Sequence, residues 1–468
     1  MTCRRPRPGA ALAGLALALA ALGCREPLPV RVVLVTLDTV RLDCLLPPGP
    51  AAEAPGGEAE GASGMPLLFA RARSGALFER FYAATSVTQP SHASMLTALH
   101  PWEHGVVSNG QVLPESVVTV PEVLREAGFA TAAVVASFPV ASRFGFGQGF
   151  DSFYEEFTED PVADRRWEGH AVPEDRFYSL ADTVTDRALE RLDELDGGAG
   201  GEAGRSQFLW VHYFDAHDPY GDTGEGPRHA VPRANTLIEQ GKDVGPLLAE
   251  FRRAYDRDVA FVDRHLDRLL ARLEADAGRF ETHVVIASDH GESFGEGGAL
   301  AHGMRLTEEQ IRVPLVILSP RLPPGVRPDV AGSVDVARTL LALAGVAAGE
   351  PWTRARDLSG LMAGLGVRAA GALGMRRTFW TKNPTELRTD GTVHSLSEPL
   401  FYAVDRSGRV FRGNGRGLSE TPPEAGAETV RGVERLFALF EERIAGGTAP
   451  AAADDETLEA LRALGYVN

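Results

Sequence analysis

The sequence predicts an α/β fold in which a mostly parallel central sheet is covered by helices on both faces. Buried parallel strands are typically near-continuous apolar runs rich in β-branched residues. Such runs occur at 30–37, 207–214, 282–288 and 313–319. Segments with helical periodicity separate these runs as far as about residue 345, and this alternation is typical of a parallel sheet. The pattern weakens after residue 345, which predicts a small α+β C-terminal region.

The remaining elements are predicted from apolar periodicity and from the positions of glycine and proline. Apolar residues spaced three and four apart predict helices at 65–73, 117–127, 175–195, 250–275, 334–343, 430–444 and 458–466. Apolar runs predict strands at 76–82 and 129–136, and shorter strands within 378–410. A loop rich in glycine and phenylalanine is expected at 145–157. The apolar stripe within 250–275 is assigned to core packing.

Three parts of the chain are expected: a signal peptide at 1–24, a main domain at 30–345 and the C-terminal region at 346–468. Residues 47–64, rich in Pro, Ala, Gly and Glu, predict a flexible surface insertion. The chain has 468 residues, enough to bury a large core. Its formal net charge of −17 argues against nucleic acid, or an anionic membrane surface, as a partner of the main body.

The N-terminus has the order of a secretory signal, with Arg4, Arg5 and Arg7 before an apolar run at 10–22. Gly23-Cys24 follows, and this order resembles the lipobox of bacterial lipoproteins, although Ala21 stands where leucine is usual. The resemblance implies lipid on Cys24 as the only membrane attachment, and a place in the bacterial cell envelope on the periplasmic or outer-surface side. The alternative is an uncleaved anchor, for which the run is short.

The stretch at 85–105 combines a predicted helix start with three histidines. Thr88 precedes Pro90 by two residues, and Pro90 suits the first turn of a helix. A hydroxyl outside a helix N-terminus lies in the positive end of the helix dipole, where anions bind. We interpret Thr88 as a nucleophile aimed at a phosphate-like or sulfate-like group. The alternative is that Thr88 and Ser91 only cap the helix.

Acidic residues or Asp/His pairs follow three of the predicted strands. Asp38 ends the first, Asp215 and His217 follow the second, and Asp289 with His290 follows the third. The carboxyl ends of parallel strands meet at one edge of a sheet, where such folds bind ligands. Carboxylates with imidazole suit a divalent cation.

These motifs, in order, resemble the sulfatase family of the alkaline phosphatase superfamily. The matching segments are VLVTLD, PSHASMLTALHPWEHG, FDAHDPY, SDHGESFGEGG and RVPLVIL, with LRALGYV near the end. The resemblance covers about 30–343 and implies that 30–345 is a catalytic domain of the alkaline phosphatase/sulfatase-like fold. It also implies an anionic ester substrate: a sulfated or phosphorylated glycan, a lipid headgroup or a small molecule.

The resemblance implies that Asp38, Asp289 and His290 bind a metal that also contacts Thr88. Zinc, manganese and calcium are the candidate ions; one ion is expected, and a second is left open. In the family this ion lowers the pKa of the nucleophile and offsets charge on the transferred group.

The resemblance also implies catalytic roles outside the metal site. His217 and His302 would face the substrate or its leaving group, and a histidine would protonate the leaving oxygen. The alternative for both is a hydrogen-bonded loop histidine. His92, which stands where the family has arginine, is predicted to be catalytic together with Thr88.

Several residues depart from the family pattern. Classical sulfatases have cysteine or serine where Thr88 stands and convert it to formylglycine, an aldehyde that threonine cannot supply. Thr39 replaces a second aspartate, and Ser137 lies where a lysine and a histidine are usual. The Thr-x-Pro-Ser-His order is similar to the nucleotide pyrophosphatase/phosphodiesterase branch, but Pro219 occupies a position where that branch has a metal-binding histidine.

The sequence therefore predicts a metal-dependent hydrolase, favoured as a phosphodiester or phosphonate hydrolase, or a phosphoryl transferase, acting through Thr88. The runner-up is a sulfuric ester hydrolase that works without formylglycine. A third interpretation is a catalytically silent binder of an anionic glycan or headgroup. The set Asp38, Asp289 and His290 argues against that third interpretation, because a pure binder has no need of it.

Overall fold

The computed structural model describes residues 27–46, 64–157, 161–167, 170–173, 178–197, 204–221, 223, 230–347, 349, 352, 355, 372–376, 385–387, 393–395, 400–405 and 407–446. The predicted signal peptide at 1–24, nearly all of the insertion at 47–64 and the helix predicted at 458–466 lie outside the described residues. Within the described part of the chain, no helix combines the length and apolar character that a membrane crossing requires.

In the described residues the main domain is built on a nine-stranded sheet in the order β12-β2-β11-β8-β1-β7-β3-β4, with β13 also paired to β2. Strands β4, β3, β7, β1 and β8 are parallel to their neighbours in this series. The predicted mostly parallel sheet is therefore confirmed. The bounds are β1 Val30–Leu37, β2 Ala76–Tyr82, β3 Ala130–Val135, β4 Ser152–Glu155, β7 Gln207–Tyr213, β8 Glu281–Ser288, β11 Arg312–Leu318, β12 Gly325–Arg327 and β13 Ala331–Gly332.

Strand β11 is antiparallel to both of its neighbours, β8 and β2. The segment between β8 and β11 holds only the short elements β9 (Ser293–Phe294), β10 (Leu300–Ala301), a 3-10 turn (Glu296–Gly298) and α10 (Glu308–Ile311). It has no crossover helix to return the chain to the other edge of the sheet, so the next strand runs back in the opposite direction. The connection therefore stays at the carboxyl edge of β8.

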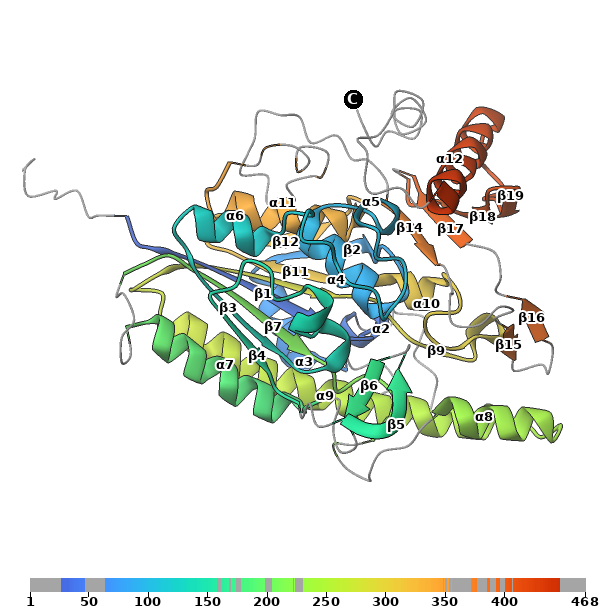
Figure 1. The fold of residues 1–468 in the computed structure, drawn as a ribbon, viewed down its shortest axis with the longest axis horizontal. Coiled ribbons are helices and arrows are strands. Elements are labelled where there is room, and N and C mark those ends of the chain that lie inside the picture. The colour runs from blue at the N-terminus through green and yellow to red at the C-terminus, as the bar shows by residue number, and fades with distance from the viewer. Residues whose placement is uncertain are drawn as a thin grey trace, which may run out of the picture.

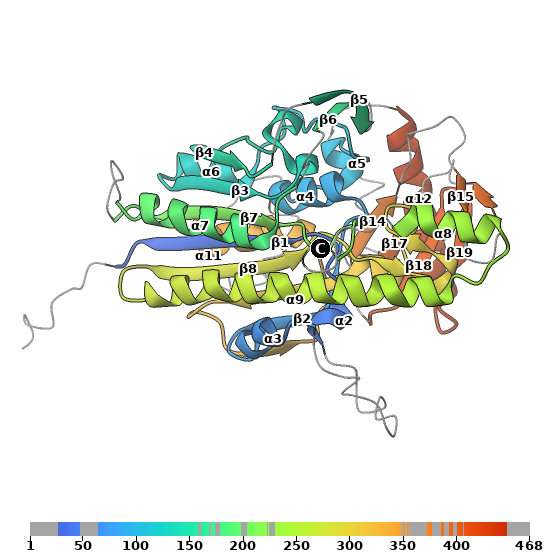
Figure 2. The ribbon, with the colours of Figure 1, turned by 90° about the horizontal axis from the view of Figure 1, so that it is seen from below.

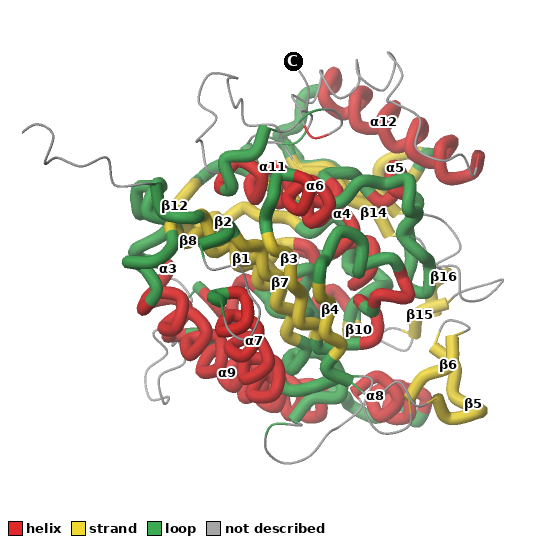
Figure 3. Tube along the Cα trace, turned by 60° about the vertical axis from the view of Figure 1, so that its left-hand side comes forward, coloured by secondary structure: helices red, strands yellow, loops and turns green. Residues whose placement is uncertain are grey.

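Helices cover both faces of the sheet (Figures 1 and 2). The helices on one face are α4 (Thr88–Thr97), α6 (Val120–Glu126) and α11 (Val334–Leu343). Those on the other are α3 (Pro66–Ala72), α7 (Ala181–Leu195) and α9 (Gly245–Ala275). Figure 3 shows the strands between these two helical layers. The layers match the predicted architecture.

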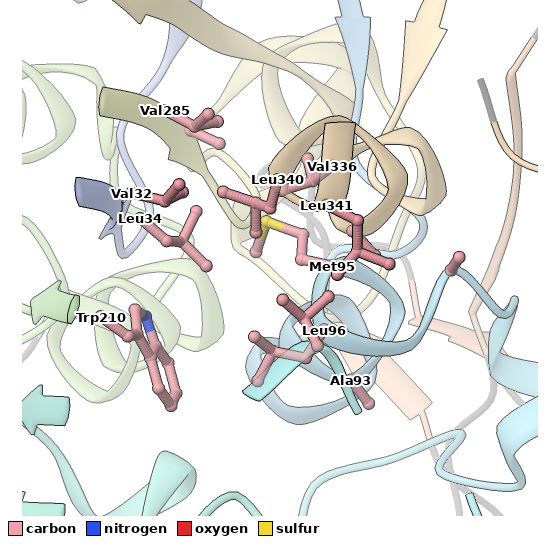
Figure 4. Packing of buried hydrophobic residues seen from close by; sticks show 14 of the residues in the cluster. Val32, Leu34, Ala93, Met95, Leu96, Trp210, Val285, Val336, Leu340 and Leu341 are labelled. Carbon is pink, nitrogen blue, oxygen red and sulfur yellow. The ribbon is translucent and has the colours of Figure 1, made fainter. Parts of the chain in front are cut away.

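The core between the sheet and α4 determines where that helix points. Met95 and Leu96 of α4 lie against Leu340 and Leu341 of α11, with Leu34 of β1 on the sheet side (Figure 4). All five side chains are buried. Burying a side chain of this size stabilises the fold by about 1.5–3 kcal/mol. This packing holds the N-terminus of α4 at the carboxyl edge of β1 and β8.

The C-terminal region contains a second sheet in the order β14-β17-β18-β19, with α12 packed against it. Trp102 of α5 stacks on Phe440 of α12 with ring centroids 3.9 Å apart, so this region is joined to the main domain beside α4. The bounds are α5 Pro101–His104, β14 Ala372–Arg376, β17 Leu400–Val404, β18 Val410–Asn414, β19 Gly417–Glu420 and α12 Ala427–Gly446. Other short elements are α2 Leu42–Leu45, α8 Ala230–Glu239, β5 Pro161–Trp167, β6 His170–Pro173, β15 Thr385–Leu387, β16 Val393–Ser395 and two 3-10 turns at Phe138–Val140 and Ser142–Phe144.

Two local predictions were wrong. The loop expected at 145–157 contains the edge strand β4, because its backbone pairs with β3. The helix expected from residue 175 begins at Ala181. Leu180 before it is extended, Ser179 donates its backbone N–H to the carbonyl of Ala136, and the Ala181 N–H donates to the Asp215 carboxylate at 2.8 Å. In both cases, contacts with segments distant in the sequence decide the local structure: β3 for β4, and Ala136 and Asp215 for the start of α7.

Candidate active site

The two strands at the centre of the sheet bring Asp38 and Asp289 together. Leu37 at the end of β1 pairs with Ser288 at the end of β8, so the residue after each strand lies at the same edge. Ligand atoms of Asp38, Asp289 and His290 all lie within 4.8 Å of one another, and all three residues are buried. The register of two parallel strands thus assembles the group from residues about 250 positions apart.

The two carboxylates are not satisfied by the protein. Both oxygens of Asp38 and Oδ2 of Asp289 have no hydrogen-bond partner among the described residues, and the side chains are fully buried. Burial, followed by the charge of Glu292, raises the pKa of Asp38. Burial and the charge of Asp38 raise the pKa of Asp289. Uncompensated buried charge is strongly unfavourable, so these oxygens are suited to bind a cation.

His290 is held in the form that binds a metal. Its Nδ1 lies 3.1 Å from the carbonyl oxygen of Gly291, to which it donates, so Nε2 carries the free lone pair. Nε2 lies 3.3 Å from Thr88 Oγ1 and 3.4 Å from Asp289 Oδ2. Burial lowers the pKa of His290 well below its usual value, which keeps the ring neutral. Oxygen and neutral nitrogen donors in this arrangement fit a divalent ion.

Thr88 is the first residue of α4, and Val87 occupies the N-cap position. Its hydroxyl contacts His290 Nε2. The backbone N–H of the next residue, Gln89, is covered by Asn109 Oδ1 at 2.9 Å. Ser91 donates its hydroxyl to the backbone carbonyl of Asp289 at 2.6 Å, which ties α4 to the end of β8. Neither hydroxyl therefore serves as the simple helix cap that the alternative interpretation required.

His92 lies one turn after Thr88 and faces the same carboxylates from behind. Its Nδ1 donates to the Thr88 carbonyl at 2.9 Å and lies 3.5 Å from Asp289 Oδ2. The ring is 1% exposed, and burial lowers its pKa to about 4. The structure thus places His92 with the site, although a catalytic role for it stays a prediction.

His217 and His302 lie side by side over His290. Their ring centroids are 4.8 Å apart, and that of His302 is 4.5 Å from that of His290. His217 stacks on Phe214 and donates Nδ1–H to the carbonyl of Asp218 at 2.6 Å. Burial and the neighbouring His302 lower the pKa of His217 to about 3. Both histidines lie beside the Asp/Asp/His group, and the role that the family resemblance implied for them, facing the substrate or its leaving group, stays a prediction.

Glu292 and Tyr220 join the site, and we had not predicted either of them. The Glu292 carboxylate accepts the Tyr220 hydroxyl at 2.8 Å and lies 3.2 Å from His302 Nδ1. Burial alone would lower the pKa of His302, but the charge and hydrogen bond of Glu292 raise it. The only signal in the sequence was the place of Glu292 in the segment SDHGESFGEGG. The fold decides that the Glu292 carboxylate points toward Tyr220 and His302.

Asp215 follows β7 but lies apart from the metal-binding group. Its Oδ1 accepts the N–H of Ala181 at the start of α7, so it caps that helix. Burial raises its pKa to about 8. Within the described residues, Asp38, Asp289 and His290 are the one group of three His, Cys, Asp or Glu side chains close enough to share an ion. The described residues therefore offer no second site of this kind for the ion that the sequence left open.

Thr39, which stands where the family has a second aspartate, supports Asp289 through its backbone. Its N–H donates to Asp289 Oδ1 at 3.2 Å. This contact requires a φ of 57°, in the left-handed region that β-branched residues rarely adopt. The backbone N–H of His290 donates to the same oxygen at 2.7 Å. Asp289 Oδ1 is thus held by the protein, and Oδ2 is left for a ligand.

The fold and the site define an α/β protein with a mostly parallel central sheet and a buried Asp/Asp/His group beside the hydroxyl of Thr88. The family model described as Sulfatase matches residues 31–346. The chain belongs to the sulfatase family, as its motifs predicted.

Curated relatives include both sulfur and phosphorus enzymes. The choline-sulfatase of Rhizobium meliloti (strain 1021) is 26% identical over an alignment of 338 positions that covers 62% of this chain and 64% of the relative. The phosphoethanolamine transferase EptA of Salmonella typhimurium is 38% identical over 66 residues, 14% of this chain and 12% of the relative. The chain spans 64% of the length of the choline-sulfatase, and the same share of the uncharacterized sulfatase YidJ of Escherichia coli.

Solved structures show the same fold. The phosphonate monoester hydrolase SpPMH from Silicibacter pomeroyi is 20% identical with a TM-score of 0.56, covering 82% of this chain and 87% of that chain. The 2-O GAG sulfatase BT1596 is 15% identical with a TM-score of 0.60, covering 90% and 92%. At these identities the likeness concerns the fold alone.

Proposed function

We propose that this chain is a metal-dependent hydrolase of monoanionic phosphoesters, with Thr88 as its nucleophile. Phosphodiesters and phosphonate monoesters are the substrate classes. The observation that supports this most is the position of Thr88 Oγ1, 3.3 Å from His290 Nε2 and beside carboxylate oxygens that the protein leaves unpaired. A divalent ion bound there lowers the pKa of the Thr88 hydroxyl and offsets charge on the transferred group.

The residue type at position 88 favours phosphorus over sulfur. A formylglycine hydrate has a geminal hydroxyl that can expel a bound sulfate, and threonine has none. An ester formed on Thr88 must be cleaved by water attacking the central atom itself. A phosphate ester permits that attack, whereas a sulfated alcohol would require attack at sulfur in a stubborn intermediate. We therefore place phosphoester hydrolysis ahead of sulfate hydrolysis.

The charges around the site favour a monoanion over a dianion. The carboxylates of Asp38, Asp289 and Glu292 would carry three negative charges, which one divalent ion and a protonated His302 would together offset without an excess of positive charge. Among the described residues, no recorded ion pair joins a lysine or arginine to these carboxylates. Arg41 approaches Glu292 only at its backbone carbonyl, and its guanidinium is paired with Asp43 and Glu296. A doubly charged phosphomonoester would meet more repulsion here than a diester.

The reaction then has two displacements at phosphorus. In the first, Thr88 Oγ1, as the alkoxide that a divalent ion would stabilise, forms a bond to phosphorus while the bond to the leaving oxygen breaks. His302 is placed to protonate that oxygen, because Glu292 holds its Nδ1 and stabilises the protonated ring. In the second, water attacks the phosphorylated Thr88, His302 takes a proton from the water, and the threonine oxygen is released. His217, stacked beside His302, borders the same space.

The names of the relatives support hydrolysis at phosphorus and hydrolysis at sulfur, and the sulfur enzymes among them suggest a second candidate function. The names phosphonate monoester hydrolase and phosphoethanolamine transferase denote phosphorus centres. The names choline-sulfatase and 2-O GAG sulfatase denote sulfate esters, so a sulfuric ester hydrolase that works without formylglycine is the second candidate. A silent binder is disfavoured, because it would bury the unpaired carboxylates of Asp38 and Asp289 without using them.

Matched aryl esters test the choice of substrate. We expect purified, metal-loaded protein to hydrolyse 4-nitrophenyl phosphodiesters and phenylphosphonate monoesters faster than 4-nitrophenyl phosphate or sulfate, measured as kcat/KM by release of 4-nitrophenol. A shared leaving group keeps the departing oxygen constant, so differences report the transferred group. If the sulfate ester is the best substrate, the second candidate replaces the first. No hydrolysis of any of these esters would favour the silent binder.

We also propose that Cys24 carries lipid and that the protein is held at the bacterial envelope. Two residues separate Cys24 from Pro27, where the described chain begins. The chain enters the sheet at the amino end of β1, and Asp38 lies at the other end, roughly 25 Å away at the rise of a strand. An anchor on Cys24 would therefore leave the active site facing away from its own membrane. This favours a glycan or a small molecule over a headgroup of the same bilayer.

Cys24→Ala should move the protein from the membrane fraction to the soluble fraction, because the thioether that carries the lipid is lost. Fractionation followed by mass spectrometry of the N-terminus measures this. Ala21→Leu, which improves the lipobox match, is the control and should stay with the membrane. An intact N-terminus beginning at Met1 in membrane-bound protein would contradict the proposal.

A further inference from the structure

Two buried polar atoms without partners face each other beside the metal-binding group. Oδ2 of Asp38 lies 3.5 Å from Nε2 of His212. His212 lies inside β7, and the sequence did not predict it as a site residue. Neither atom has a hydrogen-bond partner among the described residues. Both side chains have no exposed surface. An unpaired buried donor and an unpaired buried acceptor are each unfavourable, and a hydrogen bond between them would satisfy both.

The backbone determines which nitrogen of His212 carries the proton. The N–H of Ala136, at the end of β3, donates to His212 Nδ1 at 3.3 Å. A nitrogen that accepts a hydrogen bond has no proton of its own, so in the neutral ring the proton lies on Nε2. The N–H of His212 is therefore aimed at Asp38. The strand order supports this, because β7 lies between β3 and β1.

The ring of His212 is held from several sides. Thr36 of β1 pairs with His212 in register, and Trp210, two residues earlier on the same face of β7, donates its indole N–H to Thr36 Oγ1 at 2.9 Å. His92 of α4 closes the other side, with ring centroids 5.0 Å apart. His92 in turn points Nδ1 toward Asp289 Oδ2 at 3.5 Å. Among the described residues, the N–H of His212 has no acceptor other than Asp38, whereas the Nδ1–H of His92 is already donated to the Thr88 carbonyl.

We propose that His212 is a positioning residue that holds Asp38 by a hydrogen bond from Nε2–H to Oδ2. This contact leaves Asp38 Oδ1, which faces His290 Nε2 at 4.0 Å, as the oxygen directed at the ion. The inference rests on the metal assignment made under the proposed function. Partners behind a metal ligand fix its orientation, and losing one typically weakens metal affinity by about 10- to 100-fold.

Two variants separate this role from packing. Glutamine has an amide N–H at the position of Nε2, whereas asparagine has one only at the position of Nδ1. We expect His212→Asn to weaken the Kd for Zn²⁺ and for Mn²⁺ by about 10- to 100-fold, and His212→Gln to restore most of it. Competition with a chromogenic chelator measures Kd, and urea unfolding of the metal-free proteins measures stability. A packing role would lower the stability of both variants alike and leave both Kd values unchanged.

His283 is the matched control, because it is also buried on a central strand but contacts Ser319 near the amino end of β8. His283→Asn should change stability without changing metal affinity. The proposal is overturned if His212→Asn binds both ions as tightly as the unaltered protein, or if His212→Gln is as weak as His212→Asn.

If His212→Asn does not fold, ¹⁵N-histidine spectra of the unaltered metal-loaded protein decide the matter, since a proton on Nδ1 of His212 would refute the proposal. These measurements involve no ester, so failure of the phosphoester proposal leaves them interpretable. A protein that binds neither ion overturns the metal assignment and this inference together.

Discussion

Thr88→Ala should lower the turnover of an aryl phosphodiester by at least ~100-fold while metal content stays near normal. The hydroxyl is the proposed nucleophile, so its loss removes the bond-forming atom itself. Asp38, Asp289 and His290 still hold the ion, because their positions are set by β1 and β8. The side chain is 1% exposed, so the smaller alanine also leaves a minor cavity, whose effect on stability is small beside the loss of turnover.

This prediction is tested by measuring kcat from steady-state kinetics and the metal content of the same samples. Thr88→Ser is the matched control, since it retains a hydroxyl at the N-terminus of α4 and should retain much of the activity. If the phosphoryl group of a labelled substrate is trapped on the unaltered protein but not on the Thr88→Ala variant, the covalent intermediate is shown directly. Full activity of Thr88→Ala would show that Thr88 is not the nucleophile.

Asp289→Ala should abolish tight binding of the divalent ion and, with it, hydrolysis, while the fold is retained. Asp289 Oδ2 is one of the unpaired oxygens that the ion would satisfy, and the remaining Asp38 and His290 provide too few ligands. Metal analysis of protein purified without chelator, after supplementation with zinc, manganese and calcium, measures the loss. Asp215→Ala is the control: it removes a buried carboxylate after β7 that caps α7 and should leave the ion in place. Absence of metal from the unaltered protein would refute the assignment.

The same pair of carboxylates predicts a pH dependence for the metal-free protein. The pKa values of Asp38 and Asp289 are raised in the folded state, chiefly by burial. Between its unfolded pKa, about 4, and its raised folded pKa, such a group binds more protons when folded. Stability of the metal-free protein should therefore fall as pH rises above about 4. Asp289→Ala should flatten this dependence, and added metal should reverse it in the unaltered protein, as thermal unfolding with and without chelator would show.

The positions of the three candidate metal ligands were predictable from a local pattern, whereas their assignment as one ligand set came from the family resemblance. An apolar run predicts a buried strand, and the end of the run predicts the carboxyl end of that strand. Asp38, Asp289 and His290 lie directly after such runs. Parallel neighbours then bring those ends to one edge. The sequence predicted a helix start near Pro90, but the helix begins two residues earlier, so Thr88 is its first residue rather than a residue outside its N-terminus.

Other features needed the tertiary structure. The direction of β11 depended on a connection that stays at one edge, and β4 depended on pairing with β3. Glu292 and His212 became part of the site only because particular neighbours face them: Tyr220 and His302 in one case, Ala136 and Asp38 in the other. Periodicity reports whether a side chain is buried, but the atom that it meets there belongs to a segment far away in the chain.

The sequence by itself therefore determined the α/β class, the strand ends that hold the metal-binding residues, and a threonine where the family has the precursor of formylglycine. Only the tertiary structure decided that Asp215 caps α7 while Oδ1 of Asp38 is left for a ligand, although both residues follow a buried strand. The physical reason is the partner. Asp215 meets the free N–H of a helix, which satisfies one of its oxygens, whereas Asp38 meets Asp289 and Glu292, whose negative charges leave a position that a cation would stabilise.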